Sequence, residues 1–337
     1  MSYYRPIPMA DAARPPEALP LAGGWLWFDR VEHLRRGAAP EVIAAADLPP
    51  AVLARITAPR APLAGLTLDR PRLKGILNVT PDSFSDGGRY LAPDAAQAQA
   101  AALLAAGAEI LDVGGESTRP GAVEVSEAEE IARTAPVIAA LRAGGLGAAI
   151  SIDTRKAAVA RAALRAGADI VNDVSAFAYD PGLADVVAQS GAPLCLMHAQ
   201  GSPQDMQRDP RYDDVLLDVY DFLDDHLAWA EARGIARTRV MVDPGIGFGK
   251  TLAHNLALIR GLSLFHSLGC PILLGVSRKK FIGTLAAEPD PARRAPGSVA
   301  VALAGVAQGA QVLRVHDVWE TRQALTLWQA ATLGDGI

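Results

Sequence analysis

From Arg72 onward, short apolar runs alternate along the chain with segments whose apolar residues recur at i, i+3 and i+4. The apolar runs have the length of strands, and the i, i+3, i+4 spacing is that of one face of a helix. Strands that are apolar throughout are typical of a parallel sheet whose outer face is covered by helices. Glycines stand where the predicted helices should end, at positions 107, 144, 167, 191, 234 and 309.

The number of repeats decides between two folds. A doubly wound open sheet shares this alternation, but the chain offers eight strand candidates and at least eight helices. Eight such units in about 265 residues match the size of a closed (β/α)₈ barrel. We therefore predict an α/β fold in which residues 72–337 form a TIM barrel.

Residues 1–71 are rich in proline and alanine, which excludes long regular elements there. Within them the stretch GGWLWFDRVEHLRRG is too apolar for a free linker, and residues 41–48 and 50–56 are each predicted to form a short helix. We expect this Pro/Ala-rich N-terminal extension to be a partly ordered appendage that packs on the barrel.

Composition excludes several classes of partner. Half of the residues are hydrophobic, which suits a globular protein with a large core. The net charge is -5 at pH 7 and the basic residues are scattered, so no nucleic-acid partner is expected. No apolar run is long enough to span a membrane and the first residues lack the apolar core of a signal peptide, so we expect a cytoplasmic protein. Cys195 and Cys270 lie in apolar stretches and predict neither a disulfide nor a metal site.

Polar residues directly follow seven of the predicted strands. The seven stretches read GILNVTPDSFSDGG, ILDVGGESTRPG, AISIDTRK, DIVNDVSA, VMVDPGIGFGK, LLGVSRKKF and VLRVHD. In a (β/α)₈ barrel the carboxyl ends of the strands carry the active site, whatever the chemistry. These polar residues are therefore expected to converge on one ligand.

Asp153, Asn172 and Asp243 each end a predicted strand. Asp153 alone could cap the helix that follows it, which is a common structural role for aspartate. Three inward-pointing carboxylate and amide groups at the same end of one barrel favour a shared ligand instead. Together they suit a planar heterocycle such as a 2-amino-4-oxopyrimidine, because a carboxylate can accept two parallel N–H bonds from its edge.

The loops after the first two strands also carry polar side chains. The first loop contains Asp82 and Asp86 after Asn78, whose amide oxygen could bind Mg²⁺. The length of this loop favours a functional role over an ordinary surface connection. The second loop contains Thr118 and Arg119, and the guanidinium suits an anionic ligand. Arg119 could instead solvate the loop or pair with a neighbouring glutamate.

The last two strands end in cationic and hydroxyl groups. Ser277 and Lys279 follow the seventh strand, and Arg314 and His316 end the eighth, two residues apart and therefore on one face. Loops at these positions frequently bind phosphate in (β/α)₈ barrels, which favours a phosphate or diphosphate site over chance surface charge. The neighbouring Arg278 and Lys280 could be solvated surface cations.

Two other motifs do not carry the chemistry that they suggest. Residues 245–251, GIGFGKT, fail as a phosphate loop because Pro244 stands where its first glycine is required. His198 follows the fifth strand, but no other His or Cys lies at ligand spacing from it, so we expect it to order the adjoining loop rather than to bind zinc. Met197 and Phe248 could line the ligand pocket.

Taken together, these motifs resemble the dihydropteroate synthase family over about residues 73–331. The resemblance rests on GILNVTPDSFSDGG, DVGGESTRPG, SIDT, NDVSA, MHAQG, DPGIGFGKT, SRKKFIG and RVHDV. It implies a transferase of folate synthesis that joins 4-aminobenzoate to (7,8-dihydropterin-6-yl)methyl diphosphate, releasing pyrophosphate and forming 7,8-dihydropteroate. It also implies Mg²⁺ as a cofactor and assembly as a homodimer.

The resemblance implies a role for each site residue. The pterin would be bound by Asp153, Asn172, Met197, Asp243 and Lys279. The diphosphate would be held by Asn78, Arg119, Arg314 and His316. Mg²⁺ would lie at Asn78, near the loop residues Asp82 and Asp86. The aminobenzoate would be framed by Thr118, Arg119, Pro120, Phe248 and Ser277. The expected catalytic residues are Asp153, Lys279, Arg314 and His316.

Two other functions fit a pterin-binding barrel. A corrinoid-linked methyltransferase would need no diphosphate site, whereas residues 277–279 and 314–316 supply one. A non-catalytic barrel that only binds pterin would be expected to lack the loop residues, which are present here.

The chain departs from the family at Ala199, where a Met is frequent, and at Ile246, where a Phe is frequent. We expect both exchanges to alter packing near the pocket rather than to abolish activity.

Overall fold

Eight parallel strands form one sheet that closes on itself in this computed structural model, which describes residues 1–79, 92–117 and 121–334. Neighbouring strands pair in the order β11-β10-β9-β8-β7-β6-β13-β12. A parallel bridge between Val242 and Ile272 joins the two ends of that order and closes the barrel. The predicted TIM barrel is therefore confirmed. Its strands are β6 (Arg72–Asn78), β7 (Ile110–Gly114), β8 (Ala149–Asp153), β9 (Ile170–Asp173), β10 (Leu194–Met197), β11 (Val240–Asp243), β12 (Leu273–Leu274) and β13 (Val312–Val315).

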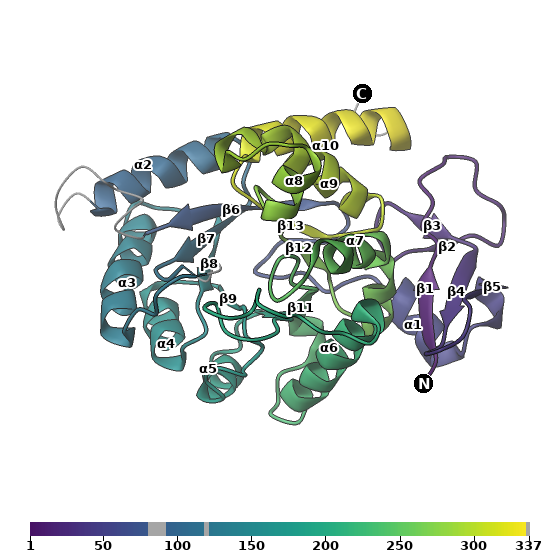
Figure 1. Cartoon of the computed structure of the whole chain (residues 1–337). Coiled ribbons are helices and arrows are strands. Elements are labelled where there is room, and N and C mark those ends of the chain that lie inside the picture. Colours follow the sequence, from purple (N-terminus) through teal and green to yellow (C-terminus); the bar gives the residue numbers. More distant parts are fainter. Residues whose placement is uncertain (80–91, 118–120, 335–337) are drawn as a thin grey trace.

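Helices cover the outside of the barrel (Figure 1). They are α2 (Ala92–Ala105), α3 (Glu127–Ala143), α4 (Ala157–Ala166), α5 (Gly182–Ser190), α6 (Val215–Glu231), α7 (Leu252–Arg260), α8 (Lys280–Leu285), α9 (Ala295–Val306) and α10 (Val318–Leu333). Short 3-10 turns η3 (Arg237–Arg239), η4 (Leu262–Leu268) and η5 (Pro291–Arg293) lie between them. Helices α4 and α5 end where the chain turns left-handed at Gly167 and Gly191, as their sequence predicts.

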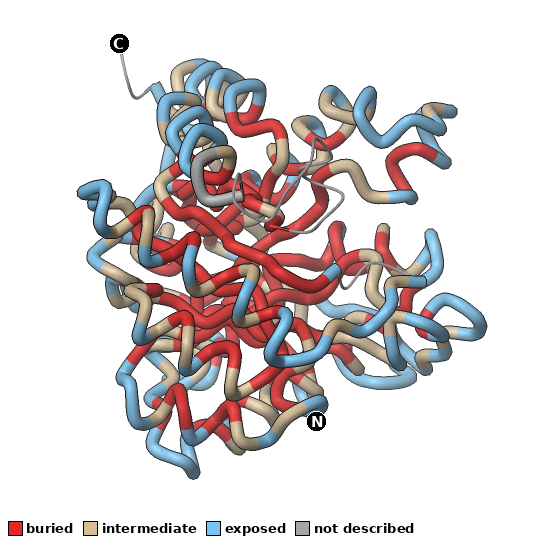
Figure 2. Tube along the Cα trace, turned by 90° about the vertical axis from the view of Figure 1, so that its left-hand side faces the viewer, coloured by how far each residue is buried: buried red, intermediate tan, exposed pale blue. Residues whose placement is uncertain are grey.

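Buried residues, red in Figure 2, are concentrated in the middle of the molecule, and exposed ones lie mainly at its outside. Residues at or next to the starts of seven strands form a separate buried cluster: Ile110, Ala149, Ile170, Cys195, Met241, Leu273 and Val312. Leu63 and Leu68, from the segment just before β6, pack into the same cluster. We call this cluster the apolar plug of the barrel. It fills the end where the strands begin, which leaves the end where the strands finish for polar side chains.

Residues 1–71 form two small sheets and one α-helix beside the barrel (Figure 1). Strands β1 (Tyr3–Pro6), β4 (Arg30–Leu34) and β5 (Glu41–Ala44) pair antiparallel, and β2 (Leu19–Pro20) pairs with β3 (Trp27–Phe28). The short turn η1 (Ala45–Asp47) precedes α1 (Pro50–Thr57), which matches the helix predicted there. The helix predicted over residues 41–48 is wrong, because pairing with β4 holds the first half of that segment as a strand.

Buried aromatic side chains and partly exposed charged groups connect the extension to the barrel. Trp25 donates from Nε1 to the carbonyl of Val306 at 3.2 Å, and it belongs to the same core as the barrel. On the α6 side, Asp221 accepts from the Tyr3 hydroxyl at 2.9 Å and from Arg36 at 2.7 Å. Across the described residues, no helix combines the length and the apolar character needed to cross a membrane.

Candidate active site

Five side chains from five different strands form a closed ring at the carboxyl end of the barrel. They are Lys74 on β6, Asp112 on β7, Asp153 on β8, Asn172 on β9 and Arg314 on β13. Because successive strands of a barrel stand side by side, residues that alternate inward on each strand meet across the interior.

Each member of the ring contacts the next. Lys74 Nζ donates to Asn172 Oδ1 at 2.7 Å, and Asn172 Nδ2 donates to Asp153 Oδ1 at 2.9 Å. Arg314 spans both carboxylates, with Nη2 2.7 Å from Asp153 Oδ2 and Nε 2.5 Å from Asp112 Oδ2. An ion pair of 2.8 Å between Asp112 Oδ1 and Lys74 Nζ closes the ring. Two cations thus face two carboxylates, which leaves the ring formally neutral.

Burial and charge act differently on the two aspartates of the ring. Burial alone would raise the pKa of Asp112, but Lys74 and Arg314 outweigh it and hold that pKa below its ordinary value. Burial raises the pKa of Asp153, with Asp112 adding to the effect and Arg314 opposing it. Asp153 is therefore the ring carboxylate whose charge is less fully compensated, which suits it to meet a developing positive charge.

Asp243 and Lys279 lie near enough to each other for the charge of each to shift the pKa of the other. Asp243 Oδ1 accepts the backbone N–H of Gly245 at 2.7 Å. Burial raises the pKa of Asp243, and Lys279 opposes that rise. Burial in turn lowers the pKa of Lys279 to about 8, although Asp243 favours its charged form. The Lys279 ammonium also donates to the carbonyl of Ile246 and lies 4.7 Å from the centre of the Phe248 ring.

The loop after β11 needs glycine for a steric reason. Gly245 has φ of +68°, and a Cβ there would lie 1.8 Å from the carbonyl oxygen of His198. The glycines of this loop therefore allow close packing against the loop after β10. Lys250 is buried in the same contact and lies 2.8 Å from His198 Nδ1, so it is not free to hold a phosphate. His198 orders this loop contact, as the sequence predicts.

Ser277 and His316 lie against each other at the ends of β12 and β13. The backbone N–H of His316 donates to Ser277 Oγ at 3.1 Å, and His316 Nδ1 lies 3.0 Å from the same oxygen. Arg278 turns away from them and forms an ion pair with Asp317. The interpretation as a solvated surface cation is therefore wrong for Arg278, whereas Lys280 is exposed. The predicted site roles of Ser277 and His316 stay predictions.

Asn78 ends β6 close to the ring. A Cβ built on Gly114 would lie 3.6 Å from Asn78 Oδ1 and 3.7 Å from Asp153 Cβ, so these two side chains flank the same glycine. Met197 ends β10, is buried, and pairs in register with Asp243. The remaining site predictions, Asp82, Asp86, Thr118, Arg119 and Pro120, fall outside the described residues.

The capping role considered for Asp153 is excluded by the start of α4. The first N–H of that helix, from Ala157, is accepted by Asp180 Oδ2 at 2.7 Å. The two carboxylate oxygens of Asp153 instead accept hydrogen bonds from Asn172 and Arg314.

Two members of the ring are not among the predicted site residues. Lys74 and Asp112 both lie within strands, whereas the predicted residues follow or end strands. A charged residue inside an otherwise apolar parallel strand is itself a signal, because a buried charge must be paired. Lys74 in RLKGILN and Asp112 in ILDVG carry that signal.

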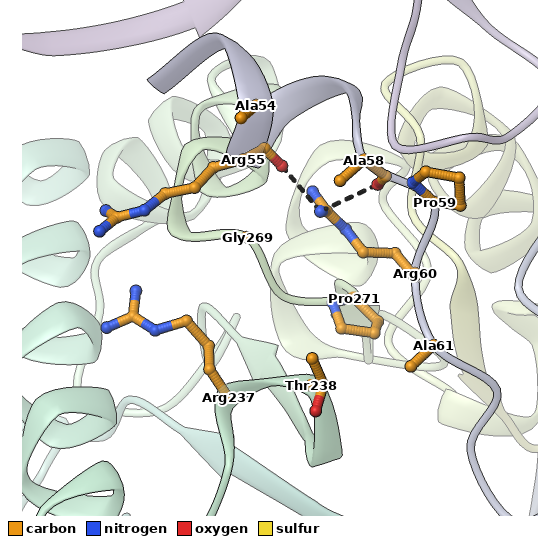
Figure 3. A pocket seen from close by; sticks show the side chains of 10 residues that line it. All are labelled: Ala54, Arg55, Ala58, Pro59, Arg60, Ala61, Arg237, Thr238, Gly269 and Pro271. Carbon is orange, nitrogen blue, oxygen red and sulfur yellow. Dashed lines mark hydrogen bonds between the residues drawn. The ribbon is translucent and has the colours of Figure 1, made fainter. Parts of the chain in front are cut away.

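Two hollows border the barrel, at opposite ends. One of about 280 Å³ lies at the carboxyl end and is lined by Phe248, Arg155, Tyr179 and Met206, among others. The other, of about 310 Å³, lies at the amino-terminal end between α1 and residues 237–238 (Figure 3). There, Arg60 already donates to the carbonyls of Arg55 and Ala58, as the dashed lines in Figure 3 show. The first hollow is lined by loops that follow the strands, and it includes Phe248, which the sequence predicts to line the ligand pocket.

Comparison with known proteins shows the family of the chain. A family model described as pterin binding enzyme matches residues 74–316. The chain is 46% identical over 256 residues to a dihydropteroate synthase of Escherichia coli (strain K12), covering 76% of this chain and 90% of that protein. Two solved structures of dihydropteroate synthase from Xanthomonas albilineans each cover 81% of this chain and 98% of theirs. The one with 4-aminobenzoic acid is 48% identical at a TM-score of 0.76, and the one in complex with 7,8-dihydropteroate is 45% identical at 0.73.

The fold is that of a (β/α)₈ barrel, and the family model and the relatives narrow that class. The chain belongs to the pterin binding enzyme family, among the dihydropteroate synthases. The family resemblance predicted from the strand-end motifs is confirmed.

Proposed function

We propose that this chain joins 4-aminobenzoate to (7,8-dihydropterin-6-yl)methyl diphosphate and so forms 7,8-dihydropteroate and pyrophosphate. The observation that carries the proposal is the pairing of Arg314 with Asp112 and Asp153, beside Asp243 and Lys279. These residues combine hydrogen-bond acceptors for a heterocycle with cations for a diphosphate in one site. Relatives solved with 4-aminobenzoic acid and with 7,8-dihydropteroate support the choice of substrates.

The pterin is assigned to Asp153, Asn172, Met197, Asp243 and Lys279. Asp243 keeps Oδ2 without a hydrogen bond to any described residue, while Oδ1 is oriented by Gly245. A carboxylate fixed in this way can accept two parallel N–H bonds from the 2-amino-4-oxopyrimidine edge. Lys279 offers an ammonium group to a ring carbonyl or nitrogen, and its position over Phe248 fixes its direction.

The diphosphate is assigned to Arg314 and His316, together with Asn78 and Arg119. A guanidinium has five N–H donors, and the described residues occupy two of those of Arg314, so three are left for phosphate oxygens. Such preorganised cations stabilise the charge that builds on a leaving group, which is usually a large contribution to catalysis.

Mg²⁺ fits the donor set at the end of β6. The ion prefers oxygen ligands and usually takes only one or two from the protein, completing its shell with water and substrate phosphates. The amide oxygen of Asn78 is a donor of this kind, and Asn78 and Asp153 flank Gly114 from the two neighbouring strands. When bound there, the ion would supply positive charge to the departing pyrophosphate.

The reaction that these residues favour begins with loss of the leaving group. The C–O bond between the pterin methylene and the diphosphate breaks, and the electron pair leaves with pyrophosphate. The resulting cation is delocalised over the electron-rich pterin, and the carboxylate of Asp153 stabilises it. The amine of 4-aminobenzoate then forms the C–N bond and loses a proton. Holding the two reactants together supplies much of the rate, and no covalent enzyme intermediate is required.

The aminobenzoate is assigned to Phe248 and Ser277, with Thr118, Arg119 and Pro120 completing its surroundings. Phe248 lines the hollow of about 280 Å³ at the carboxyl end of the barrel. Its ring can pack against the flat face of the aminobenzoate. Ser277 already contacts His316, so it can link the aminobenzoate and diphosphate parts of the site.

A two-substrate assay tests the function. Purified protein with both substrates should release pyrophosphate and form dihydropteroate in equal amounts, with a rate that depends on Mg²⁺. Absence of product at any enzyme concentration would count against the synthase. Methyl transfer from a methylated pterin to a corrinoid would instead favour the methyltransferase, and pterin binding without turnover would favour a non-catalytic role.

The proposal includes assembly as a homodimer and a cytoplasmic location. Analytical ultracentrifugation across a range of concentrations tests the first, and fractionation of cells tests the second.

A further inference from the structure

Lys74 is a buried cation in the wall of the barrel. Its side chain has no exposed surface, although it lies in a strand whose other residues are mostly apolar. Burying an ammonium group is unfavourable unless it is paired, and well-packed apolar residues often serve a core at least as well as a buried ion pair. Stability of the fold therefore gives little reason for a lysine at this position. Because its two partners, Asp112 and Asn172, belong to the candidate site, a role in that site is the better explanation.

The first consequence of Lys74 concerns the amide of Asn172. An ammonium group can only donate, so the amide atom that faces Lys74 Nζ at 2.7 Å must be Oδ1. The amide nitrogen then faces Asp153, to which it donates at 2.9 Å. Lys74 thereby fixes the orientation of the Asn172 amide, with its oxygen toward Lys74 and its nitrogen toward Asp153. This orientation determines where Asn172 presents a hydrogen-bond donor and an acceptor to a pterin.

The second consequence concerns Arg314. With Lys74 present, two cations balance the two carboxylates of the ring, because Asp112 contacts both Lys74 and Arg314. Without Lys74, two carboxylates would share the single guanidinium. Arg314 would then be held more strongly by the protein and would be less available to the diphosphate.

We infer that Lys74 is a positioning residue of the pterin diphosphate site, which sets the amide of Asn172 and balances the charge of Asp112. This inference rests on the proposed function, because it concerns the same ligand. It gives Lys74 no contact with the reacting atoms. Its effect should therefore fall on the binding of the pterin diphosphate and leave the affinity for 4-aminobenzoate unchanged.

The experiment compares four variants with the unchanged chain by calorimetric titration with (7,8-dihydropterin-6-yl)methyl diphosphate and Mg²⁺. Lys74→Met removes the charge and the donor at similar length, and Lys74→Gln keeps a donor without the charge. Lys74→Met combined with Asp112→Asn removes one charge of each sign and restores a neutral ring. Arg72→Met is the matched control, because Arg72 is a buried cation on the same strand that pairs with Glu109 at the other end of it.

We expect Lys74→Met to bind the pterin diphosphate about tenfold more weakly or worse, and Lys74→Gln to fall between it and the unchanged chain. The double variant should regain most of the lost affinity, since charges in one network couple rather than add. Arg72→Met should bind within about twofold of the unchanged chain, and KM for 4-aminobenzoate should stay within about twofold in every variant.

Wild-type affinity in Lys74→Met, or a double variant as weak as Lys74→Met, would overturn the inference. If Lys74→Met does not fold, Lys74→Gln and the neutral double variant provide the same comparison. Titration needs no turnover, so binding by the unchanged chain without product would sink the proposed reaction while leaving the role of Lys74 open to this measurement. Failure of the unchanged chain to bind the ligand would overturn both.

Discussion

Arg314 places Nη2 2.7 Å from Asp153 Oδ2, so the cation assigned to the leaving group is in contact with the carboxylate assigned to the pterin. The two halves of the proposed ligand are therefore recognised by one connected set of charges. Replacing a residue that binds one half of the ligand should therefore also change the binding of the other half, because contacting residues in one network have coupled energies.

Replacement of Arg314 tests the leaving-group role. Arg314→Lys keeps a positive charge but cannot span Asp112 and Asp153 with a rigid fork. We expect kcat/KM for the pterin diphosphate to fall by about 100-fold, as when a preorganised donor is lost. Steady-state release of pyrophosphate measures this. Arg278→Lys is the control, because Arg278 pairs with Asp317 outside the ring, and comparable losses in the two variants would contradict the assignment.

Lys279 should give the binding of pterin a pH dependence. Burial lowers its pKa to about 8, so its ammonium is largely charged at pH 7 and largely neutral at pH 9. If the charged form binds the pterin, affinity is nearly full at pH 7 and below and is lost as the pH rises through about 8. Titrations of the ligand between pH 7 and pH 9 measure the change. Lys279→Arg, which stays charged over this range, should lack the inflection, and an unchanged inflection in that variant would assign it to another group.

Asp243→Asn should separate binding from stability. The change removes a charged acceptor from the pyrimidine edge, and we expect pterin affinity to fall by about 10- to 100-fold. Stability should behave in the opposite way. Because burial raises the pKa of Asp243 in the folded state, its charge costs stability as the pH rises above the ordinary value for aspartate. The amide carries no such cost, so Tm at pH 7 should be equal or higher. A lower Tm together with unchanged pterin affinity would contradict the prediction, because it would show that Asp243 stabilises the fold and does not bind the pterin.

Asp180 gives a prediction about stability alone. It accepts the first N–H of α4 from Ala157 and also the N–H of Gly182. Asp180→Ala should reduce the free energy of unfolding by about 1–2 kcal/mol, as for other lost helix caps, and leave KM for both substrates unchanged. Denaturant unfolding measures the first and steady-state kinetics the second. Asp180→Asn retains an acceptor and should recover most of the stability.

Local patterns of the sequence account for the barrel and for the strand-end residues. Apolar strands and helical spacing are set over a few residues, so the eight repeats could be found without the structure. Asp153, Asn172 and Asp243 could be grouped because barrel geometry brings all strand ends together.

The parts that the sequence could not predict depend on pairing between distant segments. Residues 41–44 form a strand only because β4 lies beside them, and this contact overrides the helical pattern of the segment. Lys74 and Asp112 become part of the site only when β6 and β7 stand side by side. Arg278 and Arg314 look alike in the sequence, and only the fold shows that one faces Asp317 and the other the ring.

The N-terminal extension should matter for folding rather than for chemistry. Deletion of residues 1–65 would uncover the barrel surface beneath Trp25 and Phe28 and would remove Leu63 from the plug of the barrel. Loss of a single large buried side chain costs about 2–5 kcal/mol, so the deletion should exceed what a protein of ordinary stability tolerates. We expect aggregation or a strongly lowered Tm, measured by calorimetry. Leu63→Ala is the milder test, and it should lower stability while kcat per folded molecule stays the same. A deleted chain with unchanged Tm and turnover would show that the barrel folds without its extension.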